Sequence, residues 1–400
     1  MCEPSEVSLI ATGPHGFPAA QQIMSGNLRA LSEVGVRAFY IGSKQPFLLR
    51  FVHSEVNCHI LPDVVSAAVG TDAAMSSPDV LLAFRLACAA AELARSELAH
   101  GRSVVLWGTY LFPYAYSMLI AKELLGDASR CRLWITPCGS EIWEIGPQLH
   151  AVTTHLLQSM KVTEVITYTD QFASEIKCRY GIERQIHAIP PYVDSSRFYP
   201  VGDEMRRQRR ADANIPLDAF VISSHSNMRP VKRPEEVLSI AARVAASTSR
   251  RVVVLMIGPR RNLDCPQLQL PSLDVRWTGV VERVETPLSV ADVELNCSAH
   301  DAFNLSLAEA MACGVPCVSS DIVGVADEIR ACGAGFLYSK QDERNGYQEA
   351  VNYILQLASD EGRRRLVGQR GKAHANAVFS RRRALEKLVP LLVDTSDAKH

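Results

Sequence analysis

Short apolar segments alternate with longer amphipathic segments along the chain, and they do so in two series. Short runs of mostly apolar residues, bounded by polar segments, are typical of strands buried on both faces of a parallel sheet. The segments between them are long enough for crossover helices, so each series predicts a doubly wound α/β domain. The predicted strands are residues 7–11, 37–41, 103–107, 132–136 and 164–168 in the first series, and 220–224, 251–257, 275–278, 293–296 and 315–318 in the second.

Prolines mark the boundary between the two series. The segment 189–200 contains Pro190, Pro191 and Pro200, and proline stops regular structure because it lacks a backbone N–H donor. We therefore expect a first domain over residues 1–195 and a second domain from residue 196. Ligand sites are common between two such domains, so a cleft between them is the expected place for a site.

The composition is that of a large globular protein and argues against strongly charged partners. Of the 400 residues, 47% are apolar, and 42 basic residues nearly cancel 43 acidic ones, so no net field points to nucleic acid or to a membrane. The arginine-rich runs at 206–210, 363–365 and 381–383 are scattered and are interpreted as solvated helix faces. The apolar run at 81–93 is interrupted by charges, so no transmembrane segment is expected.

Cysteine usage and the N-terminus bear on the cellular compartment. The chain has 11 cysteines and no Cys-x-x-Cys pair, which favours reduced thiols in a cytoplasm over disulfides or zinc. Residues 1–6 lack the apolar core of a signal peptide. A cytoplasmic location is therefore expected.

The turn after the first strand, residues 11–18, is a weak candidate for ligand contact. It contains no G-x-G-x-x-G sequence, which argues against a dinucleotide-dependent oxidoreductase. Gly16 can let the backbone approach a diphosphate or an acceptor, or it can simply form a tight turn. His15 can contact a reacting centre, although a lone histidine also has many structural roles.

Residues 301–316 carry the strongest chemical signal. Apolar positions predict a buried helix that ends at Gly314, before the strand at 315–318. Its N-terminal N–H groups can hold a phosphate, Asp301 can accept from sugar hydroxyls, and Glu309 can accept from a ribose. The alternative is an ordinary buried helix in which Glu309 is paired with an arginine.

Two cations, Arg229 and Lys232, follow the first strand of the second domain and precede a helix that starts at Pro234. They can stabilise the negative charge that develops on a departing diphosphate, and so stabilise the transition state more than the ground state. No metal is expected, because these cations and helix dipoles supply positive charge and no Asp-x-Asp motif is present. Two exposed basic residues without a ligand are the alternative.

Together these motifs resemble those of a known family. Asp301 and Glu309, followed by Ala-Met-Ala-Cys-Gly-Val-Pro, resemble the Glu-x7-Glu signature of the retaining GT-B glycosyltransferases of family 4. Residues 226–233, Ser-Asn-Met-Arg-Pro-Val-Lys-Arg, are similar to an element of the N-acetylglucosaminyl-L-malate synthases of bacillithiol biosynthesis. Segments 110–113, 139–142 and 191–194 fall in the same order, so the similarity covers nearly the whole chain.

The resemblance implies an α/β fold of the GT-B type, with two doubly wound Rossmann-like domains facing across a cleft. It implies that residues 1–195 bind the acceptor, that residues 196–376 bind the nucleotide sugar, and that a helix in 377–400 packs back on the first domain. The implied activity is retaining transfer of a sugar from a UDP- or GDP-linked donor to a small polar acceptor, without a metal or cofactor and with a homodimer left open. The implied catalytic residues are Arg229, Lys232 and Asp301; the donor-binding residues are Gly16, Phe303, Asn304, Leu305 and Glu309; and the acceptor pocket contains His15, Thr109, Tyr110, Cys138 and Gly139.

Several positions depart from the family pattern. The chain has Trp-Gly-Thr at 107–109 and Cys-Gly-Ser-Glu at 138–141, where the family commonly has His-Ala-His and His-Gly-Thr-Asp. Asp301 is one methylene shorter than the usual Glu, and Asn304 replaces a usual Gly. Beside low-molecular-weight thiol biosynthesis, a role in secondary metabolism similar to that of the lincosamide thiol-sugar S-glycosyltransferases is therefore an option. The alternative functions are a GT-B nucleotide-sugar epimerase or phosphorylase, and a catalytically silent GT-B nucleotide-binding protein.

Overall fold

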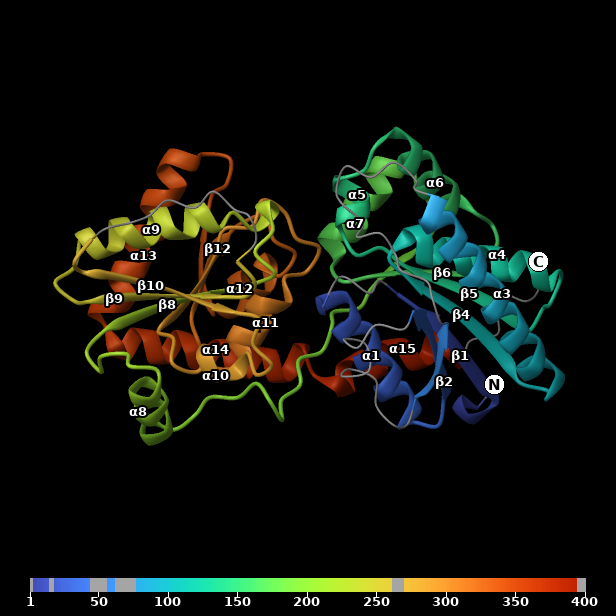
Figure 1. The fold of residues 1–400 in the computed structure, drawn as a ribbon, viewed down its shortest axis with the longest axis horizontal. Coiled ribbons are helices and arrows are strands. Elements are labelled where there is room, and N and C mark those ends of the chain that lie inside the picture. Colours follow the sequence, from blue (N-terminus) through green and yellow to red (C-terminus); the bar gives the residue numbers. More distant parts are fainter. Residues whose placement is uncertain (1–2, 14–17, 44–55, 62–76, 261–269, 394–400) are drawn as a thin grey trace. The chain divides into compact units, whose positions relative to one another are not determined.

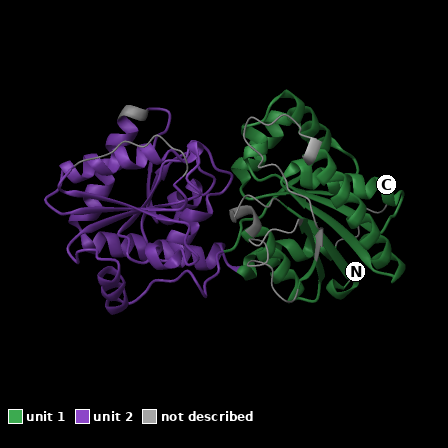
Figure 2. Ribbon diagram, viewed as in Figure 1, with its two compact units in different colours: residues 1–192, 381–400 green, residues 193–380 purple. Residues whose placement is uncertain are grey.

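The computed structural model describes residues 3–13, 18–43, 56–61, 77–260 and 270–393. The chain forms two compact α/β units, residues 1–192 with 381–400 (unit 1) and residues 193–380 (unit 2), shown in Figure 1 and coloured separately in Figure 2. The chain enters unit 2 between Tyr192 and Val193, within the proline-rich segment, and returns to unit 1 at Arg381. His15 and Gly16 lie outside the described residues.

Unit 1 contains a parallel sheet with the strand order β3-β2-β1-β4-β5-β6-β7. Strand β1 pairs with β2 on one side and with β4 on the other, so the order reverses direction there. Open α/β sheets bind ligands beside the carboxyl ends of their strands at such a reversal. The strands are β1 (Val7–Thr12), β2 (Arg37–Ser43), β3 (Asn57–Leu61), β4 (Ser103–Thr109), β5 (Cys131–Thr136), β6 (Glu164–Thr167) and β7 (Ile186–Ala188).

The helices of unit 1 include the last helix of the chain, α15, which lies beside α1 (Figure 1). Leu388 and Leu392 of α15 are fully buried and share an apolar core with α1 and the central strands. The Arg132 guanidinium on β5 donates to the Leu391 carbonyl at 2.6 Å, which ties α15 to the sheet. The helices are α1 (Pro18–Ser32), α3 (Ser77–Ala99), α4 (Tyr116–Leu125), α5 (Ser140–Trp143), α6 (Pro147–Gln158), α7 (Asp170–Tyr180) and α15 (Arg381–Val393), with short turns η1 (Pro4–Glu6) and η2 (Leu111–Ala115).

Unit 2 contains a second parallel sheet, with the order β10-β9-β8-β11-β12-β13. Here the order reverses at β8, which pairs with β9 and with β11. The strands are β8 (Phe220–His225), β9 (Val252–Ile257), β10 (Leu273–Gly279), β11 (Val293–Asn296), β12 (Cys317–Ser320) and β13 (Gly335–Tyr338). The helices are α8 (Asp203–Asp212), α9 (Pro234–Ala246), α10 (Glu285–Leu288), α11 (Leu305–Ala312), α12 (Ala326–Cys332), α13 (Glu343–Ser359) and α14 (Glu361–Val378), with the short turn η3 (Pro230–Lys232).

The two faces of the unit 2 sheet differ in chemistry. Phe220 and Ile222 on β8 and Val293 and Leu295 on β11 pack into an apolar core with α9 and α13. Successive side chains of a strand point to opposite faces, so the intervening residues of β8 and β11 lie on the other face. Those residues include Ser223, His225 and Glu294, all of them buried. The charged side chains of these two strands, His225 and Glu294, therefore lie on the same buried face.

The predicted α/β class with parallel sheets is confirmed, and all ten predicted strands lie where the pattern places them, to within two residues. The tenth, expected at 315–318, starts two residues later at Cys317, because the Val315 N–H bonds to the Ala310 carbonyl and belongs to the end of α11. Among the described residues, three strands were not predicted: β3, β7 and β13. All three are edge strands of five residues or fewer, and such short segments give little periodicity from which to predict a strand.

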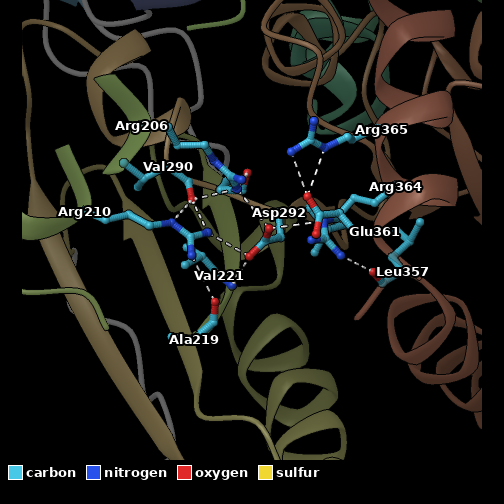
Figure 3. Close-up of polar contacts among 12 residues, drawn as sticks. Arg206, Arg210, Ala219, Val221, Val290, Asp292, Leu357, Glu361, Arg364 and Arg365 are labelled. Carbon is cyan, nitrogen blue, oxygen red and sulfur yellow. Dashed lines mark hydrogen bonds and ion pairs between the residues drawn. The ribbon is translucent and has the colours of Figure 1, made fainter. Parts of the chain in front are cut away.

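Three arginines from two of the basic runs surround one buried carboxylate, which corrects in part the interpretation of these runs as solvated helix faces. Asp292, just before β11, accepts from Arg206 and Arg210 at 2.9 Å each, and Arg364 Nε lies 3.2 Å from it (Figure 3). Only 5% of Arg210 is exposed. The run at 381–383 does keep its side chains exposed. Composition alone cannot show that α8 and α14 bring arginines to the same buried acid.

No helix in the described part of the chain combines the length and the apolar character that crossing a bilayer requires. The cysteines that the structure describes are free thiols.

Candidate active site

Helix α11 has the ends that its sequence predicts. Its residues are buried except for Ser306, and Gly314 follows it with φ of +71°, in the left-handed region that favours glycine. The Val315 N–H bonds to the Ala310 carbonyl and the Gly314 N–H to the Met311 carbonyl, both at 2.9 Å. This pair of bonds is the Schellman arrangement, which satisfies the last carbonyls of a helix.

The N-terminus of α11 is shaped by Asn304 and Asp301. The Asn304 side chain accepts from the Leu307 N–H at 3.2 Å and caps the helix. Asn304 has φ of +75°, and asparagine is one of the few non-glycine residues that adopt this conformation, so replacing the family's glycine keeps the backbone path. Asp301 Oδ1 accepts from the Asn304 N–H at 3.0 Å. Both side chains therefore hold the loop that leads into α11.

Lys232 and Arg229 lie on the loop between β8 and α9, as predicted. Lys232 Nζ donates to Asp301 Oδ2, so the two residues form an ion pair, with 18% of each side chain exposed. The Ala299 N–H also donates to the Val231 carbonyl at 2.8 Å. These bonds join the loops that follow β8 and β11, and Arg229, at the start of η3, belongs to the same loop pair.

Glu309 contacts a buried histidine at the end of β8. Its Oε2 lies 3.0 Å from Nε2 of His225, the last residue of β8. The other ring nitrogen, Nδ1, lies 2.9 Å from Oε1 of Glu294 on β11. Glu294 also accepts from the Ser223 hydroxyl and from the His225 N–H, the latter at 2.9 Å. The result is a buried chain from Glu294 through His225 to Glu309.

This chain carries a charged imidazole between two carboxylates. Burial by itself lowers the pKa of His225, because it disfavours the charged form. The charges and hydrogen bonds of Glu294 and Glu309 outweigh burial and raise the pKa of His225 to about 10. The imidazolium therefore persists at neutral pH and can donate from both ring nitrogens.

Sequence reasoning missed His225 and Glu294, although one signal was present. The predicted strand at 293–296 reads Val-Glu-Leu-Asn, with a charged residue in an otherwise buried run. A charge is almost never buried without a partner, so this Glu294 pointed to a paired group on a neighbouring strand. Only the strand pairing shows that Ser223 lies opposite Glu294 and that His225 lies two residues further on the same face.

The other donor-side candidates lie in the core of unit 2. Phe303 is 3% exposed, and its ring packs edge-on against Phe379 at a centroid distance of 5.3 Å. Leu305 is 9% exposed. Their side chains stabilise the start of α11, so any contact with a donor would come mainly from their backbone.

The acceptor-side candidates lie together on unit 1, at the carboxyl ends of β4 and β5. Thr109 ends β4 and lines a small pocket with Trp107, Thr136 and Tyr168. Tyr110, with φ of +73°, places its hydroxyl 3.1 Å from the Ser140 hydroxyl. Residues of α1 and α15 close the pocket: Ile23, Met24, Asn27 and Leu388.

Cys138 and Gly139 form the loop between β5 and α5. The Cys138 thiol lies 3.1 Å from the Tyr168 hydroxyl, beside the pocket. Burial and the neighbouring Glu141 carboxyl raise the pKa of Cys138 well above its usual range, so the thiol stays protonated and is a poor nucleophile. Gly139 has φ of +129°.

Glu141 is a second residue whose environment the sequence did not reveal. It is 3% exposed, and its Oε1 accepts from the Cys138 N–H at 2.5 Å. Burial raises the pKa of Glu141 to about 7, against the opposing effect of backbone N–H groups in the same loop. Near neutral pH this carboxyl is therefore close to its titration point. No group of three or more His, Cys, Asp or Glu side chains in the described ranges is arranged to hold a metal ion.

Comparison with known proteins agrees with this arrangement. Residues 219–357 match the family model described as glycosyl transferases group 1. The chain is 26% identical over 351 residues to the N-acetyl-alpha-D-glucosaminyl L-malate synthase of Bacillus anthracis, covering 86% of this chain and 85% of that protein. It is 29% identical over 242 residues to a D-inositol 3-phosphate glycosyltransferase of Geodermatophilus obscurus, and that match spans 56% of this chain and 51% of the relative.

Solved structures show the same fold at low sequence identity. A glycosyltransferase of Rickettsia africae superposes with a TM-score of 0.74 at 12% identity, covering 98% of both chains. The Anabaena protein HepE, in complex with UDP and glucose, superposes with a TM-score of 0.71 at 14% identity, covering 96% of this chain and 99% of that one. The chain therefore has the GT-B fold, and a glycosyl transferases group 1 domain lies within unit 2.

Proposed function

We propose that the protein is a retaining glycosyltransferase that moves a sugar from a UDP- or GDP-linked donor, bound by unit 2, to a small polar acceptor bound by unit 1. The observation that carries the proposal is the grouping of Lys232, Asp301 and Glu309 on the loops and helix that follow β8 and β11. Lys232 and Arg229 on the same loop supply positive charge, and Glu309 supplies a buried carboxylate. These groups match a nucleoside diphosphate, which carries phosphate charge at one end and ribose hydroxyls at the other.

On the donor side, each candidate residue has a separate task. Glu309 accepts from the ribose hydroxyls, because an ionised carboxylate has several acceptor positions beyond the one that faces His225. Arg229 and Lys232 stabilise the negative charge that develops on the departing diphosphate. The N-terminus of α11 adds backbone N–H groups and a positive dipole end.

On the acceptor side, the proposed place for a small polar molecule is the carboxyl ends of β4 and β5 in unit 1. Thr109, Thr136, Tyr168 and Trp107 line a small internal pocket there. The relative from Bacillus anthracis is named N-acetyl-alpha-D-glucosaminyl L-malate synthase, which supports small hydroxy acids as the first acceptors to test. A role in thiol or secondary-metabolite biosynthesis belongs to the same proposal, as does a cytoplasmic location, which the free thiols favour.

Retention is proposed to occur without a covalent sugar-enzyme intermediate. Asp301 is a poor nucleophile, because Oδ1 accepts from the Asn304 N–H and Oδ2 pairs with Lys232. The acceptor then approaches the face from which the diphosphate leaves, and a donor phosphate oxygen takes the acceptor proton. No carboxylate has to attack the anomeric carbon, in contrast to double-displacement glycosidases.

The test begins with donor binding. UDP-, GDP- and ADP-sugars are screened for thermal stabilisation, since a ligand at 100 times its Kd stabilises the folded state by about 2.7 kcal/mol. The best donor is then incubated with hydroxy acids and small thiols, and the anomeric configuration of the product is read by NMR. A retained configuration supports the proposal. Inversion would overturn the mechanism, conversion of the donor alone would indicate an epimerase, and binding without turnover of any acceptor would indicate a silent homologue.

A second test separates sugar recognition from nucleophilic attack. Asp301→Asn keeps the acceptor oxygen that bonds the Asn304 N–H, so we expect partial activity with a changed sugar preference. Abolished turnover in this variant, together with a glycosyl adduct on Asp301 of the wild type seen by mass spectrometry, would replace the front-face mechanism with double displacement.

A further inference from the structure

The polar face of the unit 2 sheet holds a histidine whose role the proposed reaction has not yet used. His225 ends β8, and Glu294 lies on β11, the neighbouring strand. His225 is 5% exposed and Glu294 is fully buried. Burying an ion pair costs desolvation free energy, which a fold can avoid by using apolar residues at the same positions. The opposite face of the same two strands carries apolar residues and Ser224, and no charged side chain.

The geometry gives the histidine a direction. Glu294 is held by three donors on β8: the Ser223 hydroxyl, the His225 N–H and the His225 Nδ1. Glu294 therefore fixes the orientation of the imidazole. The Nε2 atom of the ring lies 3.0 Å from Glu309 Oε2. Glu309 comes from α11, a separate element, so the strand pair sets the position of a side chain on the helix.

The positive charge of His225 determines how its ring contacts the two carboxylates. With both ring nitrogens protonated, His225 donates to Glu294 and to Glu309 at the same time. A neutral imidazole has one N–H and would turn a lone pair toward one of the two carboxylates. The imidazolium thus keeps Glu309 in one orientation as a hydrogen-bond acceptor.

We propose that His225, held by Glu294, is a positioning residue for Glu309, and that this buried relay sets the preference of the enzyme for ribose over 2′-deoxyribose in the donor nucleotide. The inference rests on the proposed function of Glu309 as the ribose acceptor. It predicts a defect that follows the sugar hydroxyl of the nucleotide and leaves phosphate binding intact.

The experiment compares UDP with 2′-deoxy-UDP, and GDP with 2′-deoxy-GDP, by isothermal titration calorimetry. The wild type should bind the ribonucleotide roughly 10- to 100-fold more tightly, the range expected for one hydrogen bond to a charged group. His225→Gln and Glu294→Gln should reduce this preference to about threefold or less, mainly by weakening the ribonucleotide. The matched control is His187→Gln, which removes another histidine that pairs with a glutamate, Glu164, at 2.8 Å but lies in unit 1. It should keep the full preference.

Each other outcome decides between the two proposals. If the wild type prefers ribose and Glu309→Gln removes the preference, but folded His225→Gln keeps it, the relay is overturned and the role of Glu309 stands. If the wild type binds nucleotides without any preference for ribose, the role of Glu309 as the ribose acceptor is overturned, and the relay that rests on it is overturned as well. If His225→Gln, His225→Asn and Glu294→Gln all fail to fold while His187→Gln folds, the cluster is a structural one and the positioning role is overturned.

Discussion

The two acidic residues at the start of β11 have opposite surroundings, although one residue separates them. Asp292 has three guanidinium groups around one carboxylate, from Arg206, Arg210 and Arg364 (Figure 3). Glu294 belongs to a cluster with one imidazolium and two carboxylates. The first cluster is rich in cations and the second in anions, yet both are buried.

The difference follows from the ends of the strands. Asp292 lies at the amino end of β11, where its carboxylate also accepts from the Val221 N–H at 2.8 Å. Arg210 also donates to the Val290 and Ala219 carbonyls. Its guanidinium is therefore bound by groups of the protein. The Glu294 cluster leads toward the carboxyl ends, where ligands bind to such sheets. We propose that the Asp292 cluster stabilises the fold and that the Glu294 cluster serves the site.

The largest expected effect is on folding. Asp292→Ala leaves three arginines around a site without its acid, and removing one partner of a buried ion pair costs about 3–5 kcal/mol. We expect a loss of this size in the free energy of unfolding, measured by urea denaturation. Asp327→Ala, which breaks the exposed pair with Arg330, is the matched control and should cost at most about 1 kcal/mol. A loss as small as that of the control would contradict the structural role of Asp292.

The next effect is on turnover. Arg229→Ala and Lys232→Ala should each lower kcat by roughly a hundredfold or more, because one preorganised charge contact to a developing anion contributes ~2.7–4 kcal/mol. Arg207→Ala removes an exposed arginine of α8 and should leave kcat unchanged. Wild-type kcat in both loop variants would remove these cations from the mechanism and leave Lys232 with only its contact to Asp301.

A smaller effect is expected on nucleotide affinity. Glu309→Gln keeps the shape of the side chain but loses the charge, so UDP or GDP should bind ~1.5–3 kcal/mol more weakly by calorimetry. Glu328→Gln, at a glutamate that pairs with His374, is the control within unit 2 and should bind as the wild type does. Unchanged nucleotide affinity in folded Glu309→Gln would mean that the Glu309 cluster, like the Asp292 cluster, has only a structural role.

The last expected effect is the pH dependence of stability, which should have opposite signs for the two clusters. Burial raises the pKa of Asp292, but its three arginines outweigh this and hold the pKa below the ordinary 3.8. Its contribution is therefore present above pH 3.8 and is lost as the pH falls below that value. The pKa of His225 is raised from 6.5 to about 10, so its contribution is fully present below pH 6.5 and is lost as the pH rises through about 10.

Urea midpoints measured from acid to alkaline pH check these signs. His225→Gln should flatten the alkaline decline of the wild type, and Asp292→Asn should flatten the acid decline. An alkaline decline that is equal in His225→Gln and the wild type would mean that the histidine does not carry a proton between its two carboxylates.

The sequence by itself determined the elements whose signals are local. Apolar runs predict the buried strands, and apolar positions followed by a glycine predict α11. The placement of Arg229, Lys232 and Asp301 at the ends of these elements could therefore be predicted as well. The edge strands β3, β7 and β13 were not predicted, because strands of five residues or fewer give little periodicity in the sequence.

Only the tertiary structure decided which charged side chains meet. The arginines of α8 and α14 converge on Asp292 across more than 80 and more than 70 positions of the chain, and His225 meets Glu309 across 84. Such contacts depend on strand register and on how helices pack over the sheet, which no local pattern encodes. A charge within a buried strand shows that a partner must exist, because an unpaired buried charge is too costly, but only the fold names that partner.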